Sequence, residues 1–187
     1  MEKLQEIVNK SRSSQNKKEL FSLLSVVSEA NPKTIIEIGS WRGYLLETLD
    51  SAFNKVSEPI FLLGVEKDAS SVAPEMADKF KIIIEDSQQT NTLLYLKKLL
   101  GNKKIDLLLI DGDHRYSAVK QDFESFSPLV RKGGFVAFHD IKLTGKKWRD
   151  SGVEVSKLWL EIRNTGQRYY EFYDQDGQGT GTGLLQL

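Results

Sequence analysis

The sequence contains no cysteine among its 187 residues. This absence excludes disulfides, zinc–thiolate sites and a cysteine nucleophile. Long apolar runs are also missing, since none approaches the roughly 20 residues that a membrane span needs. The polar start, Met1–Gln5, does not resemble a signal peptide. We therefore expect a cytoplasmic protein.

Neither sign of charge is in excess. Lysine plus arginine and aspartate plus glutamate both count 26, which gives a formal net charge of zero. A neutral chain has no global basic field to attract nucleic acid or an anionic membrane, so neither partner is expected and a small molecule is favoured. The length fits a single domain, residues 1–187, that can bury a sizeable core.

Apolar runs alternate with segments of helical periodicity after a helical lead-in at residues 1–30. Strands are expected at 34–38, 60–65, 81–84, 105–110, 135–140, 168–173 and 184–187. Helices are expected at 18–29, 43–53, 70–79, 92–100, 116–130 and 153–164, with turns at 132–134 and 177–183. This alternation predicts a doubly wound, Rossmann-like α/β fold over residues 34–187. Its sheet would have seven mostly parallel strands, with helices on both faces.

Two of the apolar runs end abruptly in acids and a histidine. The run 105–111 is followed by Gly-Asp-His, and the run 135–140 ends in His-Asp. Ligands of open parallel sheets collect at the carboxyl ends of the strands, and neighbouring strands lie about 4.8 Å apart. If these strands are neighbours, Asp111, His114, His139 and Asp140 can share one ion or one substrate.

The first strand leads into a glycine-containing loop. Gly39 and Gly43 are four residues apart, so the G-x-G-x-x-G order of dinucleotide-binding proteins is absent and a different adenosine ligand fits better. The second strand ends at Glu66, about two dozen residues later, where a doubly wound fold places an acid on ribose hydroxyls. The alternative is that the glycines only cap a helix and that Glu66 is a solvated charge.

These motifs resemble those of class I S-adenosylmethionine-dependent methyltransferases. Residues 37–43 look like motif I, Glu66 like the ribose-binding acid, and residues 85–88 like the adenine-contacting segment. Residues 110–114 and 133–140 resemble the metal-dependent branch that contains cephalosporin hydroxylase-like proteins and macrolide sugar O-methyltransferases. Catechol O-methyltransferase is a more distant resemblance. The likeness spans about residues 34–141 and covers both ends of the chain weakly.

The resemblance implies S-adenosylmethionine as cofactor and assigns residues to three roles. The methyl donor would be bound by Glu37, Gly39, Ser40, Gly43, Glu66, Asp86, Ser87, Gln88 and Asp111. A divalent metal, Mg²⁺ or Mn²⁺, would be held by Asp111, His139 and Asp140. The catalytic residues would be Asp111 and His114, with His114 at the position of a base.

Two of these assignments have alternatives. Relatives more often carry an acid where this chain has His139, and an imidazole ligand moves the preference from magnesium toward manganese, iron or zinc. The alternative for His139 is that it is a core histidine, or one that only supports the metal ligands without binding the metal. His114 is otherwise a helix-capping or ribose-proximal residue.

Methyl transfer from a sulfonium is an in-line displacement, which requires an oxygen nucleophile held about 3 Å from the methyl carbon. A metal on Asp111 and Asp140 would lower the pKa of that hydroxyl and orient it. His114, with a reference pKa near 6.5, would remove the proton at neutral pH.

Aromatic and basic residues suggest how the pocket is completed. Trp41, Tyr44 and Trp148 are candidates for its walls. The polar and basic segment 141–152 would lie over the acidic edge, as a lid or as an attractor of an anionic acceptor; the alternative is a solvated charge run.

The sequence thus predicts O-methylation of a small-molecule hydroxyl, of the sugar or secondary-metabolite type. The alternatives are a metal-dependent hydroxylase, an NAD-type oxidoreductase, or a module that binds S-adenosylmethionine without turnover. Residues 1–30 and 141–152 carry no motif that identifies the acceptor. A homo-oligomer in which a second subunit completes the acceptor pocket is left open.

Overall fold

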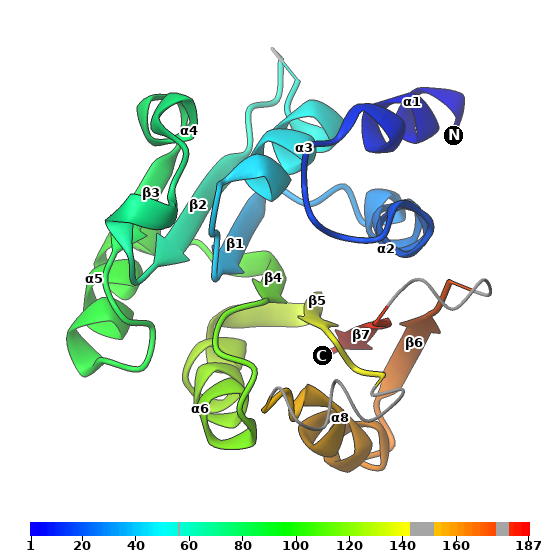
Figure 1. Ribbon diagram of the computed structural model, residues 1–187, viewed down its shortest axis with the longest axis vertical. Coiled ribbons are helices and arrows are strands. Elements are labelled where there is room, and N and C mark those ends of the chain that lie inside the picture. The colour runs from blue at the N-terminus through cyan, green and yellow to red at the C-terminus, as the bar shows by residue number, and fades with distance from the viewer. Residues whose placement is uncertain (56, 143–151, 175–179) are drawn as a thin grey trace.

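The computed structural model describes residues 1–55, 57–142, 152–174 and 180–187. A seven-stranded sheet runs through it in the order β3-β2-β1-β4-β5-β7-β6 (Figure 1). The strands are β1 (Thr34–Ile38), β2 (Phe61–Glu66), β3 (Lys81–Ile84), β4 (Ile105–Ile110), β5 (Val130–His139), β6 (Arg168–Phe172) and β7 (Thr182–Gln186). Strands β1 to β5 pair in parallel, and β7 runs antiparallel to both β5 and β6. The predicted, mostly parallel doubly wound sheet is therefore confirmed.

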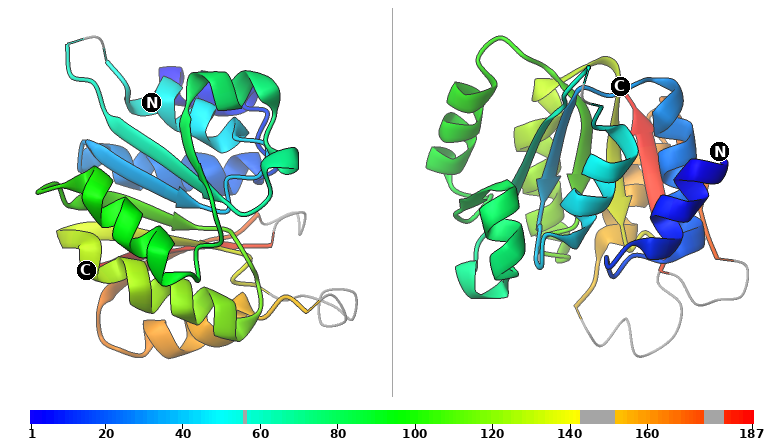
Figure 2. Two further views of the ribbon diagram at one scale, coloured as in Figure 1. Left: turned by 90° about the vertical axis from the view of Figure 1, so that its left-hand side faces the viewer. Right: turned by 90° about the horizontal axis from the view of Figure 1, so that it is seen from above.

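Helices cover both faces of this sheet (Figure 2). One face carries α1 (Glu2–Lys10), α2 (Lys17–Glu29) and α3 (Tyr44–Phe53). The other carries α5 (Thr90–Leu100), α6 (Tyr116–Phe126) and α8 (Val155–Arg163). The short α4 (Pro74–Lys79) packs through Met76 into a small separate cluster. None of the helices in the described ranges combines the length and the apolar character needed to cross a bilayer.

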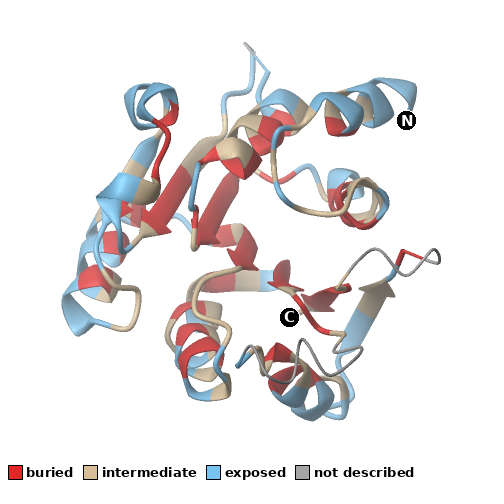
Figure 3. Ribbon diagram, viewed as in Figure 1, coloured by how far each residue is buried: buried red, intermediate tan, exposed pale blue. Residues whose placement is uncertain are grey.

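Side chains of the central strands alternate between two buried clusters, because successive residues of a strand point to opposite faces. Ile35 packs under α2 and α3, whereas Ile36 packs toward α5, α6 and α8. Both faces are covered, so all five residues of β1 are buried, and buried residues run along the middle of the sheet (Figure 3). This explains why β1 and β4 are nearly continuous apolar runs in the sequence.

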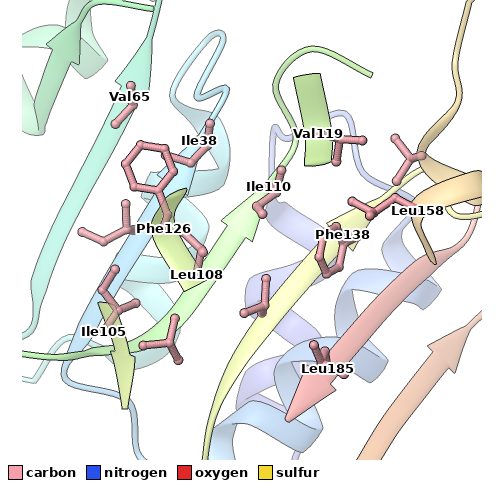
Figure 4. Close-up of a cluster of buried hydrophobic side chains, with 14 of the residues drawn as sticks. Ile38, Val65, Ile105, Leu108, Ile110, Val119, Phe126, Phe138, Leu158 and Leu185 are labelled. Atoms are coloured by element: carbon pink, nitrogen blue, oxygen red, sulfur yellow. The ribbon is translucent and has the colours of Figure 1, made fainter. Parts of the chain in front are cut away.

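The larger cluster, between the sheet and α5, α6 and α8, consists mainly of Ile, Leu and Val side chains and also contains the rings of Phe126 and Phe138 (Figure 4). Phe138 of β5 lies with its ring centroid 5.5 Å from that of Phe123 and 5.7 Å from that of Trp159. Each such pair contributes about 0.5–1.5 kcal/mol beyond the area it buries. These contacts fix α6 and α8 against the strand that ends at His139.

The register of the strands brings their carboxyl ends to one level. Ile38 pairs with Ile110 across β1 and β4, and Ile110 pairs with Phe138 across β4 and β5. The next residues along the three strands, Gly39, Asp111 and His139, therefore emerge at the same edge of the sheet.

The structure corrects three sequence predictions. The helix expected at 70–79 is a short 3-10 turn at Ala69–Ser71 followed by α4, which begins at Pro74. Proline has no N–H for the preceding turn and disfavours helical backbone in the residue before it, so no helix continues through this position. For the same reason the helix expected at 116–130 ends at Phe126, and a 3-10 turn holds Pro128.

The turn expected at 132–134 lies instead inside β5, which begins at Val130. Gly133 has a φ of 74°, and its N–H and the carbonyl of Gly134 bond to Leu187. The register against β4 shifts just before this point. The glycines therefore form an irregularity within β5, where Leu187, the residue after β7, satisfies the backbone groups.

Some predictions fall partly outside the described residues. Trp148 and the basic segment 143–151 lie there, as do residues 177–179 of the predicted turn at 177–183, of which Thr182 begins β7. Lys142 is described, and its ammonium group lies 5.2 Å from the centre of the Tyr173 ring.

Candidate active site

A cavity of about 360 Å³ opens at the carboxyl ends of β1, β2 and β4. Most of the predicted site residues line it, namely Glu37, Gly39, Ser40, Glu66, Ser87, Gln88, Asp111, His114 and His139. Gly43, Asp86 and Asp140 lie behind this lining. The topological rule for doubly wound sheets therefore located the cavity correctly.

The loop after β1 approaches β4 so closely that only glycine fits at its start. Gly39 has a φ of 84°, and a Cβ there would lie 2.5 Å from the carbonyl carbon of Asp111. Its N–H and that of Ser40 both donate to the carbonyl of Val65, at 2.8 and 3.1 Å. The start of this loop is therefore held between β2 and β4, and the cavity lies next to it.

Gly43 serves a different purpose. It is the N-cap of α3, has a φ of 79°, and a Cβ there would lie 2.8 Å from the Cβ of Met76. The residue allows α4 to pack against the start of α3, whose amino-terminal end carries the partial positive charge of the helix dipole. Gly43 thus shapes the loop after β1 through its packing against Met76.

Glu66 lies at the rim of the cavity and organises two turns. Its Oε2 accepts the N–H of Trp41 at 2.8 Å, and its Oε1 accepts that of Asp68 at 3.1 Å. Each carboxylate oxygen has a further lone pair, so Glu66 can also accept from ligand hydroxyls. Trp41 adopts a φ of 43° and keeps 53% of its surface exposed. Its indole stands beside the opening.

The segment after β3 is shaped by Asp86, whose Oδ1 accepts the N–H of Gln88 at 3.0 Å. The carbonyl of Gln88 accepts a hydrogen bond from the side chain of Gln121 on α6 at 2.8 Å. Asp86 therefore holds the loop while Ser87 and Gln88 face the cavity.

Glu37 is buried on β1, and its Oε2 has no hydrogen-bond partner among the described residues. Burial raises the pKa of this carboxyl well above its usual value, and the negative charges of Asp111 and Glu66 raise it further. Both effects favour the neutral form of Glu37. A cationic ligand group in the cavity would favour its ionised form.

Four side chains form a histidine–aspartate cluster at the ends of β4 and β5. Asp140 Oδ2 lies 2.8 Å from His114 Nδ1, and Asp111 Oδ1 lies 3.2 Å from His114 Nε2. His139 Nδ1 lies 3.1 Å from Asp111 Oδ1 and 3.1 Å from Asp140 Oδ1. All four predicted residues therefore meet.

The two imidazoles share the two carboxylates. Burial alone would lower the pKa of His114, but the hydrogen bonds to Asp111 and Asp140 outweigh it and raise this pKa to about 10. The same opposition of burial and carboxylate charge raises the pKa of His139 to about 9. Burial would raise the pKa values of Asp111 and Asp140, yet the histidines hold both below their usual range.

In this arrangement both histidines are cations at neutral pH and each is paired with carboxylates. Across the described ranges, no group of three or more His, Cys, Asp or Glu side chains is placed so as to hold a metal ion. His139 Nδ1 and Asp140 Oδ1 are nevertheless buried without a hydrogen bond. The donor types suit a divalent metal, while the present geometry pairs them with one another.

One further contact at the site has no signal in the sequence. Gln15, in the linker between α1 and α2, donates from Nε2 to Asp111 Oδ2 at 2.7 Å. Only the amide N–H can face a carboxylate, which fixes Gln15 Oε1 as a buried acceptor without a partner among the described residues. Ser13 and Ser14 of the same linker also line the cavity.

The linker is anchored on both sides of Gln15. The guanidinium of Arg12 bonds Glu47 at 2.9 Å and lies 4.1 Å from the centre of the Tyr44 ring. Asn16 caps α2 and donates to Asp174 at 2.8 Å. Tyr44, predicted as a pocket wall, does line the cavity and also holds this linker.

With this geometry in hand, comparisons with known proteins identify the family. Residues 21–141 match the model of a family described as "Methyltransferase domain". Over 154 residues the chain is 50% identical to the uncharacterized protein R132 of Acanthamoeba polyphaga mimivirus, covering 77% of this chain and 67% of that protein.

Solved structures share the fold at low sequence identity. The O-methyltransferase from Bacillus cereus in complex with SAH is 14% identical, with a TM-score of 0.66, covering 100% of this chain and 91% of that one. The MycE methyltransferase of the mycinamycin biosynthetic pathway, in complex with Mg and SAH, is 17% identical, with a TM-score of 0.64, covering 98% and 54%.

The chain therefore belongs to the methyltransferase-domain family. The prediction of a methyltransferase is confirmed by the family match, and the solved methyltransferase structures confirm the predicted fold.

Proposed function

We propose that this methyltransferase transfers the methyl group of S-adenosylmethionine to a hydroxyl oxygen of a small molecule. The observation that carries the proposal is that the glycine turn, Glu66 and the histidine–aspartate cluster all face one cavity. Its volume of about 360 Å³ lies in the range of small-molecule sites. A donor and an acceptor can meet there within reach of a base.

The donor would occupy the part of the cavity between the loops after β1, β2 and β3. The missing side chain at Gly39 permits close approach of the donor, and Glu66 can accept hydrogen bonds from its ribose hydroxyls. Ser87 lines the part of the cavity where the adenine ring would lie. The donor carries an ammonium and a sulfonium, and the cavity presents the acidic residues Glu37, Glu66 and Asp111 to them. Gly43 and Asp86 support these loops without lining the cavity.

The acceptor hydroxyl would lie between Asp111 and His114. Asp140 is closer to Nδ1 of His114 than Asp111 is to Nε2, so the neutral tautomer keeps its proton on Nδ1. Nε2 is then free to take the hydroxyl proton. The carbon–oxygen bond forms as the carbon–sulfur bond breaks, and the sulfonium leaves as a neutral thioether.

A pKa of about 10 makes neutral His114 a minor form at neutral pH, at roughly one molecule in a thousand. This pKa describes the cluster without a bound cation, so turnover measured in the presence of EDTA and limited by this base should rise about tenfold per pH unit between pH 7 and 9. The reference pKa near 6.5 that the sequence suggests does not apply in this cluster, because two carboxylates stabilise the cation.

A divalent cation is part of the proposal. Asp111, His139 and Asp140 would hold it, since their oxygen and nitrogen donors converge and two of these buried atoms lack hydrogen bonds. When bound, the ion would act as a Lewis acid that lowers the pKa of the acceptor hydroxyl. Thermal unfolding with Mg²⁺ or Mn²⁺ against EDTA tests this, because a ligand bound only by the folded state raises the melting temperature.

The acceptor class is proposed to be a sugar or secondary-metabolite hydroxyl. MycE, whose name places it in mycinamycin biosynthesis, supports this through its fold. The cavity supports it through its polar lining of serine, glutamine and acidic side chains. A homo-oligomer that completes the acceptor pocket stays a prediction.

The decisive experiment replaces Asp111 or His114 by alanine. Turnover, measured as S-adenosylhomocysteine formed with a panel of sugars and phenols, should be lost in both variants. Binding of S-adenosylhomocysteine by calorimetry should stay within a few fold in the His114→Ala variant, because His114 is not among the residues proposed to bind the donor. Asp113→Ala is the matched control, since Asp113 lines the same cavity but pairs with Arg115 outside the cluster. Retained activity in both cluster variants refutes the assigned roles.

The alternatives give different results in the same assays. An NAD-type oxidoreductase would be stabilised by NAD in thermal unfolding and not by S-adenosylhomocysteine. A binding module would bind S-adenosylhomocysteine and be indifferent to loss of His114. A metal-dependent hydroxylase would consume no methyl donor.

A further inference from the structure

Helix α8 contacts both parts of the chain that build the histidine–aspartate cluster. Trp159 of α8 packs on Phe138, whose ring centroid lies 5.7 Å away and which immediately precedes His139 on β5. At the start of the helix, the backbone N–H of Glu154 donates to the carbonyl of His114 at 2.7 Å. The helix therefore fixes the loop after β4 relative to the end of β5.

The loop that carries His114 has few other supports. Among the hydrogen bonds of the described residues, the bond from Glu154 is the one that ties the backbone of residues 112–115 to an element other than α6, which follows directly. Asp113 and Arg115 bond to each other, so their hydrogen bonds stay within the loop. The place of His114 in the cluster therefore depends on Glu154.

The side chain of Glu154 makes a second contact with the same turn. Its Oε2 accepts the backbone N–H of Tyr116, the first residue of α6, at 3.1 Å. The first N–H groups of a helix have no partner within it, and Arg115 at the N-cap supplies no side-chain hydrogen bond. A carboxylate is also favoured there by the helix dipole. Two hydrogen bonds from one residue thus hold His114 and the start of α6.

We propose that Glu154 is a positioning residue for methyl transfer, which holds the loop after β4 so that the imidazole of His114 stays between Asp111 and Asp140. Glu154 lies outside the lining of the cavity, so it acts through the backbone and touches neither the donor nor the reacting atoms. The inference rests on the proposed function, in which His114 is the base, and adds the residue that sets its position.

The first test measures turnover in Glu154→Ala, which removes the acceptor for the N–H of Tyr116. A misplacement of about 1 Å at a reacting group can lower a rate by up to about a hundredfold. We therefore expect kcat, measured with the best acceptor of the sugar and phenol panel, to fall at least about tenfold. The KM for S-adenosylmethionine should stay within a few fold, because Glu154 bonds none of the residues proposed to bind the donor.

Glu154→Gln tests whether the accepting oxygen is what matters. The amide oxygen of glutamine can accept the N–H of Tyr116, so this variant should keep most of the wild-type kcat. The substitution removes the charge and with it the ion pair to Lys157, so retained turnover assigns the effect to the hydrogen bond. If Glu154→Ala does not fold, Glu154→Asp takes its place, because the shorter side chain draws the carboxylate away from Tyr116.

Glu161→Ala is the matched control. Glu161 also lies on α8 and also bonds Tyr116, but its Oε1 accepts the side-chain hydroxyl, at 2.7 Å, and not the backbone N–H. Both alanine variants therefore delete one carboxylate from the same contact between α8 and α6. Only Glu154→Ala should lower kcat, and melting temperatures check that each variant is folded.

The second test needs neither an acceptor nor activity. The chain has two histidines, so a protein with isotope-labelled histidine gives two imidazole signals in NMR, which His114→Gln and His139→Gln assign. At constant pH and with EDTA present, Glu154→Ala should broaden or split the signal of His114, because the ring is no longer held in one position. Glu154→Gln and Glu161→Ala should leave that signal as it is in the wild-type protein.

The outcomes separate the inference from the proposed function. The role of Glu154 is overturned, while methyl transfer stands, if Glu154→Ala keeps the wild-type kcat, if Glu161→Ala loses as much, or if Glu154→Gln is as slow as Glu154→Ala. An unchanged His114 signal in Glu154→Ala overturns it as well. A wild-type protein that methylates no acceptor of the panel counts against the proposed function, and the imidazole signals then decide alone whether Glu154 positions His114.

Discussion

The two histidines of the chain make its stability depend on pH in a way that the structure predicts. Both lie in the cluster with Asp111 and Asp140, and the pKa values of His114 and His139 are raised to about 10 and about 9. A histidine whose pKa is raised on folding stabilises the folded state. This stabilisation is fully present at pH values below the pKa of the unfolded chain, near 6.5. This stabilisation is lost as the pH rises through the folded value.

The magnitude follows from counting protons. Between pH 7.5 and 8.5 the folded protein holds nearly two imidazole protons and the unfolded chain holds almost none. Each proton of difference changes the free energy of unfolding by about 1.4 kcal/mol per pH unit. The folded state should therefore lose about 2–3 kcal/mol over this one unit, which is a large part of the roughly 5–15 kcal/mol of a typical domain.

The assay is urea unfolding at several pH values between 6 and 9, at constant ionic strength and with EDTA to keep metal ions away from the cluster. Urea is preferred to guanidinium chloride because salt screens the charges in question. We expect the free energy of unfolding to fall with pH about half as steeply in His114→Gln, and in His139→Gln, as in the wild-type protein. The double variant has no histidine, so it measures whatever slope other groups contribute.

A flat free energy between pH 7.5 and 8.5 in the wild-type protein refutes the reasoning. It would mean that the folded imidazoles are neutral, and His114 would then be a base at neutral pH without further change. The same measurement therefore decides which protonation state the chemistry starts from.

Four other substitutions, one of them a control, give sharp expectations. Gly39→Ala should cost more than the ~1–2 kcal/mol of left-handed backbone and abolish S-adenosylhomocysteine binding, because its Cβ collides with the carbonyl of Asp111. Gly166 has a φ of 82° and open space around it, so Gly166→Ala should lower the free energy of unfolding in urea only by the cost of left-handed backbone. If Gly39→Ala and Gly166→Ala lower it equally, the collision with Asp111 has no effect. Gln15→Leu removes the hydrogen bond to Asp111 and should lower turnover at least about tenfold while calorimetry shows unchanged donor affinity; unchanged turnover shows that Gln15 does not position Asp111. Asn16→Ala removes the cap of α2 and should lower the free energy of unfolding by about 1 kcal/mol in urea, whereas an unchanged midpoint denies the cap a role.

The strands that bear the site were predictable almost residue by residue. Strands β1, β3 and β4 have the expected bounds. For β1 and β4 the reason is that buried parallel strands are nearly continuous apolar runs with polar residues at their ends. The errors occurred at Pro74, Pro128 and Gly133, where the side-chain pattern continues but the backbone cannot. Hydrophobic periodicity indicates which face of an element a side chain occupies. It does not indicate a missing backbone N–H or a positive φ.

The sequence was sufficient to predict which residues form the site. It was not sufficient to predict how these residues pair with one another or how their pKa values shift. Sheet topology brings together Asp111, His114, His139 and Asp140 from two runs of sequence. Their mutual pairing, and the pKa values it produces, depend on burial and on distances that no motif encodes. Gln15 reaches Asp111 across 96 positions of sequence through a linker without periodicity, so the pattern of residues contains no signal for it.

Trp41 has a practical consequence. Its indole is 53% exposed at the rim of the cavity, whereas Trp159 is 2% exposed in the core. Indole fluorescence shifts when solvent is displaced, so a Trp148→Phe protein would leave one tryptophan that responds to occupancy and one that serves as an internal standard. The enzyme would thus signal the arrival of a ligand by its own emission, without a label or a known acceptor.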